Sequence, residues 1–247
     1  MKLHYYIILV FIIVPSQSFA KLENVNTNYE LKLNIFGIYV KIGDINSYLT
    51  SNNKKYNLNF DLVSDDLVNI ISPIIGNGII NGSIDGSFLY PENYRYTYTK
   101  KNKKKFTKIQ FYNSNVTSSE TIPEYDKNKL TPIDPKMLLG TIDPITAIIY
   151  IGNYNLNNKC SINYRIYDGK RRYDLNYTAI FDKDGYVVCR LTQKKIGGFK
   201  LINEKKDLFK PAQQIDTYYQ IIDDKYVLKK IITKSKFSKI LINVSYF

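Results

Sequence analysis

The segment Tyr167–Leu175, with the sequence YDGKRRYDL, places three basic residues in a row between acids and tyrosines. Such a row could bind phosphate groups or nucleic acid, because hydrogen bonds from cations to these anions are strong. Reading of nucleic-acid bases would also need an exposed aromatic platform or a helix that enters the major groove. The residues of interest are Lys170, Arg171 and Arg172.

The same segment has the sequence of a hairpin. Asp168-Gly169 predicts a tight turn, because glycine adopts the positive φ that such turns require. Apolar residues alternate on both sides, so Lys170–Arg172 are expected to leave the turn and enter a strand. Alternation then places Arg172 on the face opposite Tyr173 and Leu175. Whether that face meets solvent or a cleft decides whether the charge of Arg172 has a role of its own.

A second basic segment lies between two strand patterns, at residues 100–105. Its lysines could contact anionic head groups, at about 1 kcal/mol for each cation near such a surface. The alternative is a solvated hairpin loop whose charges prevent edge-to-edge aggregation of the sheet. The candidate anion contacts are Lys100, Lys101, Lys103, Lys104 and Lys105.

Residues 1–20 have the pattern of a secretory signal peptide: Lys2, an apolar core, and Ser18-Phe19-Ala20 before the expected cleavage site. The core of roughly ten residues is shorter than the ~20 that span a bilayer, so a retained signal anchor is the weaker alternative. Cleavage after Ala20 leaves Lys21–Phe247 as a single β-rich domain, which is expected in the periplasm.

The only histidine, His4, lies within these first twenty residues. The exported chain therefore lacks the imidazole base that Ser-His-Asp and Cys-His nucleophilic sites need. Zinc sites usually need histidine or several cysteines. We predict no catalytic, metal-binding or cofactor-binding residue and no cofactor. Hydrolysis by a pair of carboxylates, for example of wall glycans, remains the enzymatic alternative.

The chain is strongly basic, with a net charge of +13 that becomes +12 when residues 1–20, which hold one lysine and no acid, are removed. A basic protein attracts anionic partners. Export disfavours nucleic acid, so lipid or an anionic envelope polymer is the expected partner, with peripheral contact to the membrane. The alternative is that the lysines reflect AT-rich codons, which also favour the abundant Asn, Ile and Tyr.

The two cysteines, Cys160 and Cys189, are expected to form a disulfide, since their number is even and the compartment is oxidising. A flat three-strand meander would separate them by about 9–10 Å, at ~4.8 Å for each strand. A disulfide needs Cα atoms within ~7 Å. We therefore predict that Cys160 lies in a segment folded over the sheet, or that the strand register slips.

Alternation of apolar and polar residues with period two predicts strands at residues 29–35, 56–62, 94–98, 107–111, 162–166, 173–177, 186–190, 226–232 and 240–244. Helices are expected at Asp66–Ile71 and at Thr141–Ile151, where Asp143-Pro144 is a favourable start. The segment Ile122–Leu139 contains three prolines and predicts an irregular connection. The glycines of residues 76–86 predict a flexible turn or a sheet bulge rather than a phosphate-binding loop.

The resulting fold class is mainly β: one curved antiparallel sheet or open half-barrel with one or two short helices. An outer-membrane barrel is the rival, because the chain ends in Phe247. Polar residues at Ser245, Asn243 and Lys239 interrupt the apolar alternation that a lipid-facing last strand would show.

YDGKRRYDL, preceded by Cys160 and followed by Val187–Lys200 (VVCRLTQKKIGGFK), resembles the alphaproteobacterial branch of the domain of unknown function 3108 family. In that family one cysteine leads into an F/Y-D-G-R-R-R-Y/F-D-L core and a second cysteine follows. Thr141–Ile151 is similar to the family's D-P-hydrophobic segment, and Tyr29–Asp44 to its N-terminal strand pair. Ile196-Gly197-Gly198 departs from the family pattern, which usually has Pro and a spaced Gly. The motif positions here are Asp143, Pro144, Asp168, Gly169, Arg171, Arg172, Tyr173 and Asp174.

The resemblance implies a periplasmic, β-rich protein without assigned catalytic residues, and a fold similar to the open half-barrel of outer-membrane lipoprotein carriers, which curl a sheet around a helix. We therefore expect a non-enzymatic envelope protein that binds a lipid-like or anionic envelope ligand. Two alternatives stay open: a carboxylate-dependent wall-glycan enzyme, and a structural or protein-interaction module with an exposed apolar patch or an open sheet edge.

Overall fold

The computed structural model describes residues 24–52, 54–71, 73–86, 88–100, 102–152, 160–183, 185–201, 214–222, 225–234 and 239–247. The expected signal peptide, residues 1–20, and Lys101 lie outside these ranges. Within them, no helix has the length and apolar character needed to cross a membrane.

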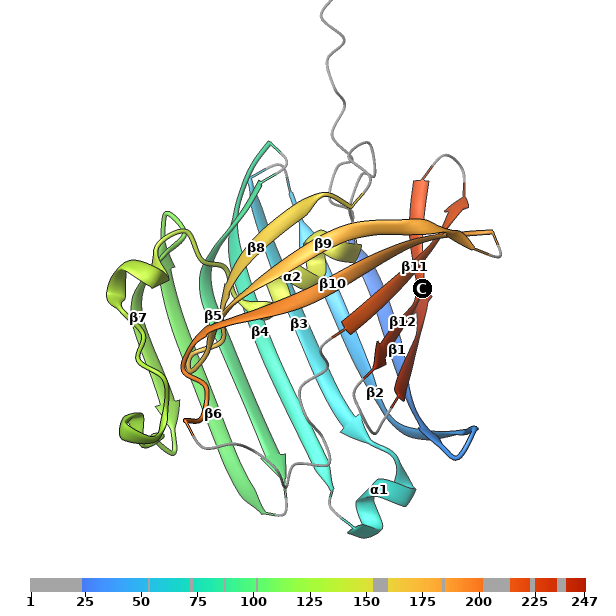
Figure 1. The fold of residues 1–247 in the computed structure, drawn as a ribbon, viewed down its shortest axis with the longest axis horizontal. Coiled ribbons are helices and arrows are strands. Elements are labelled where there is room, and N and C mark those ends of the chain that lie inside the picture. Colours follow the sequence, from blue (N-terminus) through green and yellow to red (C-terminus); the bar gives the residue numbers. More distant parts are fainter. Residues whose placement is uncertain are drawn as a thin grey trace, which may run out of the picture.

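Thirteen strands form one antiparallel sheet in the order β7-β6-β5-β4-β3-β2-β1-β13-β12-β11-β10-β9-β8 (Figure 1). Their bounds are β1 Val25–Ile35, β2 Ile38–Ser51, β3 Lys55–Ser64, β4 Ile74–Asp85, β5 Phe88–Lys100, β6 Lys103–Tyr112, β7 Asn115–Ile122, β8 Ile162–Tyr167, β9 Arg172–Lys183, β10 Tyr186–Gly197, β11 Gln214–Ile222, β12 Lys225–Lys234 and β13 Lys239–Tyr246. The sheet stays open, with β7 and β8 as its edge strands. The predicted fold class, one curved antiparallel sheet, is confirmed.

The sheet curls back on itself around a helix. Figure 1 shows β8, β9 and β10 crossing the strands of the N-terminal half, with α2 (Pro144–Gly152) at the crossing. Two residues of α2 pack against different halves of the sheet. Ile149 belongs to the core of β2–β6, and Ile151 belongs to the core of β9–β13. A helix inside an open, curled sheet is the arrangement that the family resemblance implied.

Both predicted helices are present, because their start signals are local. α1 spans Asp66–Ile71, as expected, and α2 begins at Pro144, directly after Asp143. The expected irregular connection contains only two short 3-10 helices, η1 (Lys127–Lys129) and η2 (Pro135–Leu138).

The residues between this connection and α2 lie along an open edge of the sheet. Ile142 N donates to Arg165 O at 2.9 Å, and Tyr167 N donates to Ile142 O at 3.0 Å, so Ile142 pairs with β8. Thr141 N donates to Ser114 O, in the turn between β6 and β7, at 2.8 Å. The segment thus bridges the two edge regions and satisfies backbone groups that an open edge would expose.

Four strands were not predicted from alternation: β2, β4, β7 and β11. Of these, β2 was expected only from the similarity of Tyr29–Asp44 to the N-terminal strand pair of the family. In β4 the glycines alternate on the inner face, and a Cβ at Gly78 would collide with the Phe60 ring, as one at Gly82 would with the Tyr56 ring. Of the two expectations for residues 76–86, the sheet bulge is confirmed after Asn81, whereas the turn is confined to Gly86 at the end of β4. Gly78 and Gly82 make room for aromatic rings from the neighbouring strand.

Candidate functional site

The first motif pair, Asp143-Pro144, builds the N-terminal end of α2. Asp143 Oδ1 accepts hydrogen bonds from Ile145 N and Thr146 N, both at 2.9 Å, and Oδ2 accepts from Thr146 Oγ1 at 2.6 Å. Tyr56 Oη lies 2.9 Å from Thr146 Oγ1. Since the Thr146 proton goes to Asp143, Tyr56 is the donor of that bond. Asp143 therefore caps α2 and links it to β3 through Thr146.

Asp143 is fully buried, and this burial raises the pKa of its carboxyl group. The hydrogen bonds from Thr146 and from the backbone act in the opposite direction but do not cancel the effect. Its charge also raises the pKa values of Tyr56 and Tyr94, after burial itself. The carboxylate is thus enclosed by tyrosines of the inner face and has no access to solvent.

The second motif segment forms the turn between β8 and β9. Asp168 Oδ1 accepts from Lys170 N at 3.0 Å and from Arg171 N at 2.6 Å, and Arg171 Nε donates to Asp168 Oδ2 at 2.7 Å. Tyr167 pairs with Arg172, so the turn has four residues, 168–171. The prediction of a two-residue turn is corrected: Lys170 and Arg171 lie within the turn, and only Arg172 enters the strand, because the Asp168 side chain organises the longer loop.

Arg172 is buried and its charge is paired. Its Nη1 donates to Asp174 Oδ1 at 2.7 Å, and its Nε donates to Met137 O at 2.8 Å. Tyr173 instead belongs to the core cluster that contains Ile142. The two side chains therefore lie on opposite faces, as alternation predicted, and the face of Arg172 meets the irregular connection rather than solvent.

The glycine of this turn lies against β6 and β7. Tyr167 Oη and Tyr125 Oη donate to Gly169 O at 3.0 and 3.1 Å, and a Cβ at Gly169 would collide with the Thr107 side chain. Gly169 has a φ of +88°, which only glycine adopts without strain. Glycine is needed here both for the backbone conformation and for the close approach.

This packing brings cations from separate segments together in a basic cluster, which we define as Lys105, Lys170, Arg171 and Lys200. The Nζ atom of Lys105 lies 5.6 Å from the centre of the Tyr98 ring, and that of Lys170 lies 5.6 Å from the Tyr125 ring. Burial lowers the pKa of Lys170, and the charges of Arg171, Lys105 and Lys200 lower it further. Each of these three cations is therefore close enough to Lys170 to repel its charge.

Residues 100–105, which we call the lysine hairpin, connect β5 to β6 and supply one side of this cluster. Lys100 pairs with Lys103 and Tyr98 with Lys105, whereas Lys104 pairs with Thr99 on the other face. The interpretation as a hairpin loop is only partly right, because Lys103, Lys104 and Lys105 lie in β6. All three are exposed. Within the described part of the chain, no ion pair to an acid is recorded for any of them.

An aromatic surface continues inward from Lys105. The Tyr98 ring stacks on Tyr96, with centroids 5.5 Å apart, and Tyr96 stacks on Phe60, at 5.7 Å. Tyr96 and Tyr98 are half-buried, and burial raises the pKa of Tyr96 to about 12. The basic cluster therefore borders a stack of three rings on the inner face of the sheet.

The disulfide lies at the other end of α2. The Cα atoms of Cys160 and Cys189 are 6.0 Å apart. Continuing the β8–β9 register would place residue 160 opposite Ala179, across β9 from Cys189. Cys160 instead lies outside β8, which begins at Ile162, and has a positive φ of 56°. In addition, the register of β10 shifts beside Cys189. The predicted bond and the predicted fold-over are both present.

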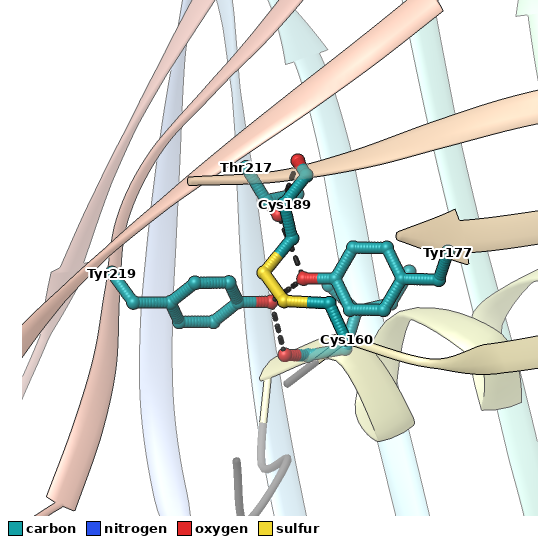
Figure 2. Close-up of a disulfide and its surroundings, with 6 residues drawn as sticks. Cys160, Tyr177, Cys189, Thr217 and Tyr219 are labelled. Carbon is teal, nitrogen blue, oxygen red and sulfur yellow. Dashed lines mark hydrogen bonds between the residues drawn. A yellow bond between two sulfur atoms is a disulfide. The ribbon is translucent and has the colours of Figure 1, made fainter. Parts of the chain in front are cut away.

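A network of hydroxyl groups accompanies the disulfide (Figure 2). Tyr177 Oη bonds with the hydroxyl groups of Thr217 and Tyr219, Thr217 Oγ1 donates to Cys189 O at 3.2 Å, and Tyr219 Oη donates to Ile151 O at 2.7 Å. Ile151 is in the last turn of α2, where carbonyl groups lack helical partners. The network therefore joins the C-terminal end of α2 to β9, β10 and β11.

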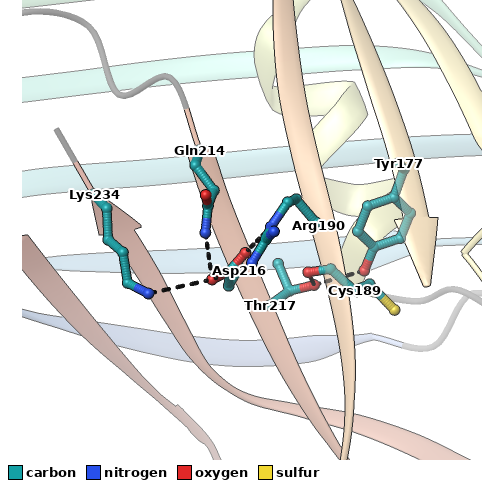
Figure 3. Close-up of polar contacts among 7 residues, drawn as sticks. All are labelled: Tyr177, Cys189, Arg190, Gln214, Asp216, Thr217 and Lys234. Carbon is teal, nitrogen blue, oxygen red and sulfur yellow. Dashed lines mark hydrogen bonds and ion pairs between the residues drawn. The ribbon is translucent and has the colours of Figure 1, made fainter. Parts of the chain in front are cut away.

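The remaining buried acid, Asp216, is also paired. Figure 3 shows it among Arg190, Gln214 and Lys234. Arg190 Nε donates to Asp216 Oδ1 at 2.8 Å, and Gln214 Nε2 donates to Oδ2 at 2.9 Å. These bonds outweigh burial and lower the pKa of Asp216. A carboxylate-dependent enzyme would need two acids in a shared cleft, whereas Asp216 and Asp143 each serve a separate structural contact.

Two surface hollows are described, with volumes of about 350 and 260 Å³. Asparagines and other polar side chains line both, including Asn57 and Asn81 in the first and Asn46 and Asn59 in the second. Neither contains a member of the basic cluster. A carrier would show an inner face with unpacked apolar side chains, whereas the inner face here is packed by α2.

The structure thus separates the predicted site residues into two groups. Motif residues Asp143, Arg172, Tyr173 and Asp174 hold the interior together, whereas Arg171 joins the lysines in the basic cluster. Sequence reasoning did not single out Lys200, although it ends the second motif segment, or Tyr125. Nothing in the irregular sequence around Tyr125 indicates its contact with Gly169, which is 44 residues away.

A search of the curated proteins finds no relative. Among solved structures, the chain is similar to a β-barrel-like protein of domain of unknown function DUF1849 from Brucella abortus, with a TM-score of 0.49 and 8% sequence identity over 92% of this chain and 98% of that one. The profile described as "Protein of unknown function (DUF3108)" matches residues 28–237. The chain therefore belongs to the DUF3108 family.

Proposed function

We propose that this chain is an exported, non-enzymatic protein of the cell envelope that binds an anionic, lipid-like ligand at the basic cluster. The observation that carries the proposal is the convergence of cations from three separate segments beside a stack of aromatic rings. Lys105 comes from β6, Lys170 and Arg171 from the β8–β9 turn, and Lys200 from the segment that follows β10.

The cluster has the charge balance of an anion site. Asp168, which is bonded to Arg171, is the one acid whose charge raises the pKa of Lys170. Gathering like charges costs free energy in the empty protein, and an anion bound among them would remove that repulsion. The pKa of Lys170 is lowered first by burial and then by the charges of Arg171, Lys105 and Lys200, which a bound anion would offset.

The surroundings favour an amphiphile over a simple inorganic anion. Next to Lys105, the rings of Tyr98 and Tyr96 offer half-buried apolar surface on the same face of the sheet. An acyl chain or other apolar group could lie on these rings while its anionic head contacts the lysines. Because α2 packs the interior, the ligand would rest at the opening of the curled sheet and would not be enclosed by it.

The periplasmic location is part of the proposal. It is supported by the signal-peptide pattern of residues 1–20 and by the Cys160–Cys189 disulfide, a bond typical of oxidising compartments.

The test is native mass spectrometry of protein purified from its own periplasm, with added short-chain phosphatidylglycerol. The double variant Lys105→Glu/Lys200→Glu should lose roughly 10- to 100-fold in affinity, at about 1 kcal/mol for each cation. Its matched control is Lys54→Glu/Lys55→Glu, which makes the same charge change at exposed lysines at the opposite end of β3 from α1.

If phosphatidylglycerol binding falls equally in both double variants, the lipid is attracted by the net charge of the protein, and the basic cluster is not the binding site. Equal binding of short-chain phosphatidylcholine would show that the anionic head is not recognised. Absence of binding in the wild-type chain would reject the function itself.

A further inference from the structure

The turn between β1 and β2 contains an aromatic residue in an unusual backbone conformation. Ile35 pairs with Ile38, so Phe36 and Gly37 are the only residues of the turn. Both have positive φ, 50° and 93°. Such two-residue turns favour Asn, Asp and Gly, because these residues adopt positive φ at low cost. A bulky side chain there is a genuine outlier.

Packing does not compensate for this conformation. The exposed fraction of Phe36 is 102%, and those of Ile38 and Ile35 are 69% and 44%. We call Ile35–Ile38 the tip. It contains no charged residue. Phe36 therefore contributes neither to the core nor to a favourable turn, and Asn at this position would give a more stable hairpin.

The residues behind the tip are those that proteins place at a membrane surface. Lys239 Nζ lies 5.5 Å from the centre of the Tyr39 ring, one residue beyond Ile38. Tyrosine is enriched at the membrane–water interface, and lysine extends its charge from there into water or toward anionic lipid. The acids Glu30 and Asp44 are each paired with a lysine. They add little repulsion toward an anionic surface.

The lysine hairpin lies at the same end of the sheet as the tip. In the antiparallel order, the β1–β2 turn, the α1 connection and the β5–β6 turn all fall on one side, which is the lower edge in Figure 1. β2 and β5 are three strand spacings apart, about 14 Å along the sheet. A flat anionic surface that contacts Lys103 and Lys104 would therefore also face the tip.

We propose that the tip inserts into the surface of an anionic lipid bilayer. A turn flanked by one residue on each side reaches roughly 7 Å at ~3.4 Å for each residue, which matches the ~5–10 Å depth of interfacial segments. Three side chains offer far less than the ~800 Å² for each partner of a stable protein complex, so a second copy of the chain fits the tip poorly. This contact does not depend on a ligand at the basic cluster.

Tryptophan fluorescence tests the contact directly, because the chain contains no tryptophan. Phe36→Trp creates one reporter at the tip. Phe88→Trp is its matched control, since Phe88 is 62% exposed and begins β5 at the opposite end of the sheet. With vesicles of phosphatidylethanolamine and phosphatidylglycerol, we expect a blue shift and quenching by brominated acyl chains at position 36. Neither effect is expected at position 88.

A second variant measures what the tip contributes. Phe36→Asn suits the turn, so it should raise the denaturant midpoint while it weakens vesicle binding roughly 10- to 100-fold, the loss expected for one buried aromatic side chain. The control Phe88→Asn should bind vesicles like the wild-type chain.

The proposal is overturned if Phe36→Asn binds vesicles as tightly as the wild-type chain, or if the spectra at positions 36 and 88 respond alike. It is also overturned if vesicles never shift the spectrum at position 36 while a lipid-free envelope protein fraction does, because the occupant would then be a protein.

Discussion

The two ends of α2 are attached to the sheet by different chemistry. At the N-terminal end, the buried carboxylate of Asp143 accepts three hydrogen bonds. The Thr146 hydroxyl group also forms a hydrogen bond with Tyr56 on β3. At the C-terminal end, Ile151 accepts from Tyr219, beside the disulfide. The first attachment depends on the oxygen atoms of one buried carboxyl group, whereas the second combines neutral hydroxyl groups with a covalent bond.

The difference indicates how each end holds the curled sheet. The N-terminal cap is made mostly by residues within three positions of Asp143, so it forms with the helix itself. The C-terminal attachment joins residues up to 68 positions apart and requires β9, β10 and β11 to be in place. The Asp143 cap therefore starts the helix, and the long-range contacts fix the C-terminal half of the sheet against it.

The largest expected effect is loss of the disulfide. Replacing both Cys160 and Cys189 with Ala should lower the free energy of unfolding by about 3–4 kcal/mol, because the bond closes a long loop, with a sequence separation of 29. Urea denaturation monitored by tyrosine fluorescence measures this loss. The wild-type chain in reducing buffer is the control and should lose a similar amount. If the reduced chain unfolds at the same urea concentration as the oxidised chain, the hydroxyl network alone holds this end.

An intermediate effect is expected at the other end of α2. Asp143→Ala removes the acceptor of Ile145 N and Thr146 N and should cost about 1–2 kcal/mol. Asp143→Asn is the matched control, because its amide oxygen accepts the same backbone bonds and its NH₂ group can donate to Thr146. Urea denaturation at neutral pH should therefore place the Asn variant near the wild-type chain and the Ala variant well below it.

The same pair of variants tests the charge through pH. Burial raises the pKa of Asp143 above its ordinary value of 3.8, so the associated stability is complete below about pH 3.8 and is lost as the pH rises through the folded-state pKa. The Asn variant lacks this titration. Its stability relative to the wild-type chain should therefore increase between pH 4 and neutrality. A difference that does not change with pH would mean that the pKa of Asp143 is the same in the folded and the unfolded chain.

Local signals explain how much of this architecture the sequence predicts. Asp143-Pro144 marks the start of α2, and alternation marks most strands, since both depend on neighbouring residues. β4 was not predicted because several of its inner positions are glycines that make room for rings of β3. β7 was not predicted because its sequence, NVTSSETI, has no alternation of apolar and polar residues. The basic cluster could not be predicted for a similar reason: Lys105 and Lys200 both lie near Lys170 only because the sheet curls back.

The smallest effect is expected for Tyr219→Phe, which removes the donor to Ile151 O and a partner of Tyr177. We expect a loss of about 1 kcal/mol, the net value of one buried hydrogen bond, from urea denaturation. The comparison variant is Tyr150→Phe, which removes two part-buried bonds with the backbone of Leu89, one accepted from its N–H group and one donated to its carbonyl oxygen, and should cost a similar amount. Combining Tyr219→Phe with Asp143→Ala then compares the two ends directly. If they act independently, the two losses should add within about 0.5 kcal/mol. A larger coupling would show that α2 transmits the state of one attachment to the other, and the two ends would have to be treated as one cooperative unit.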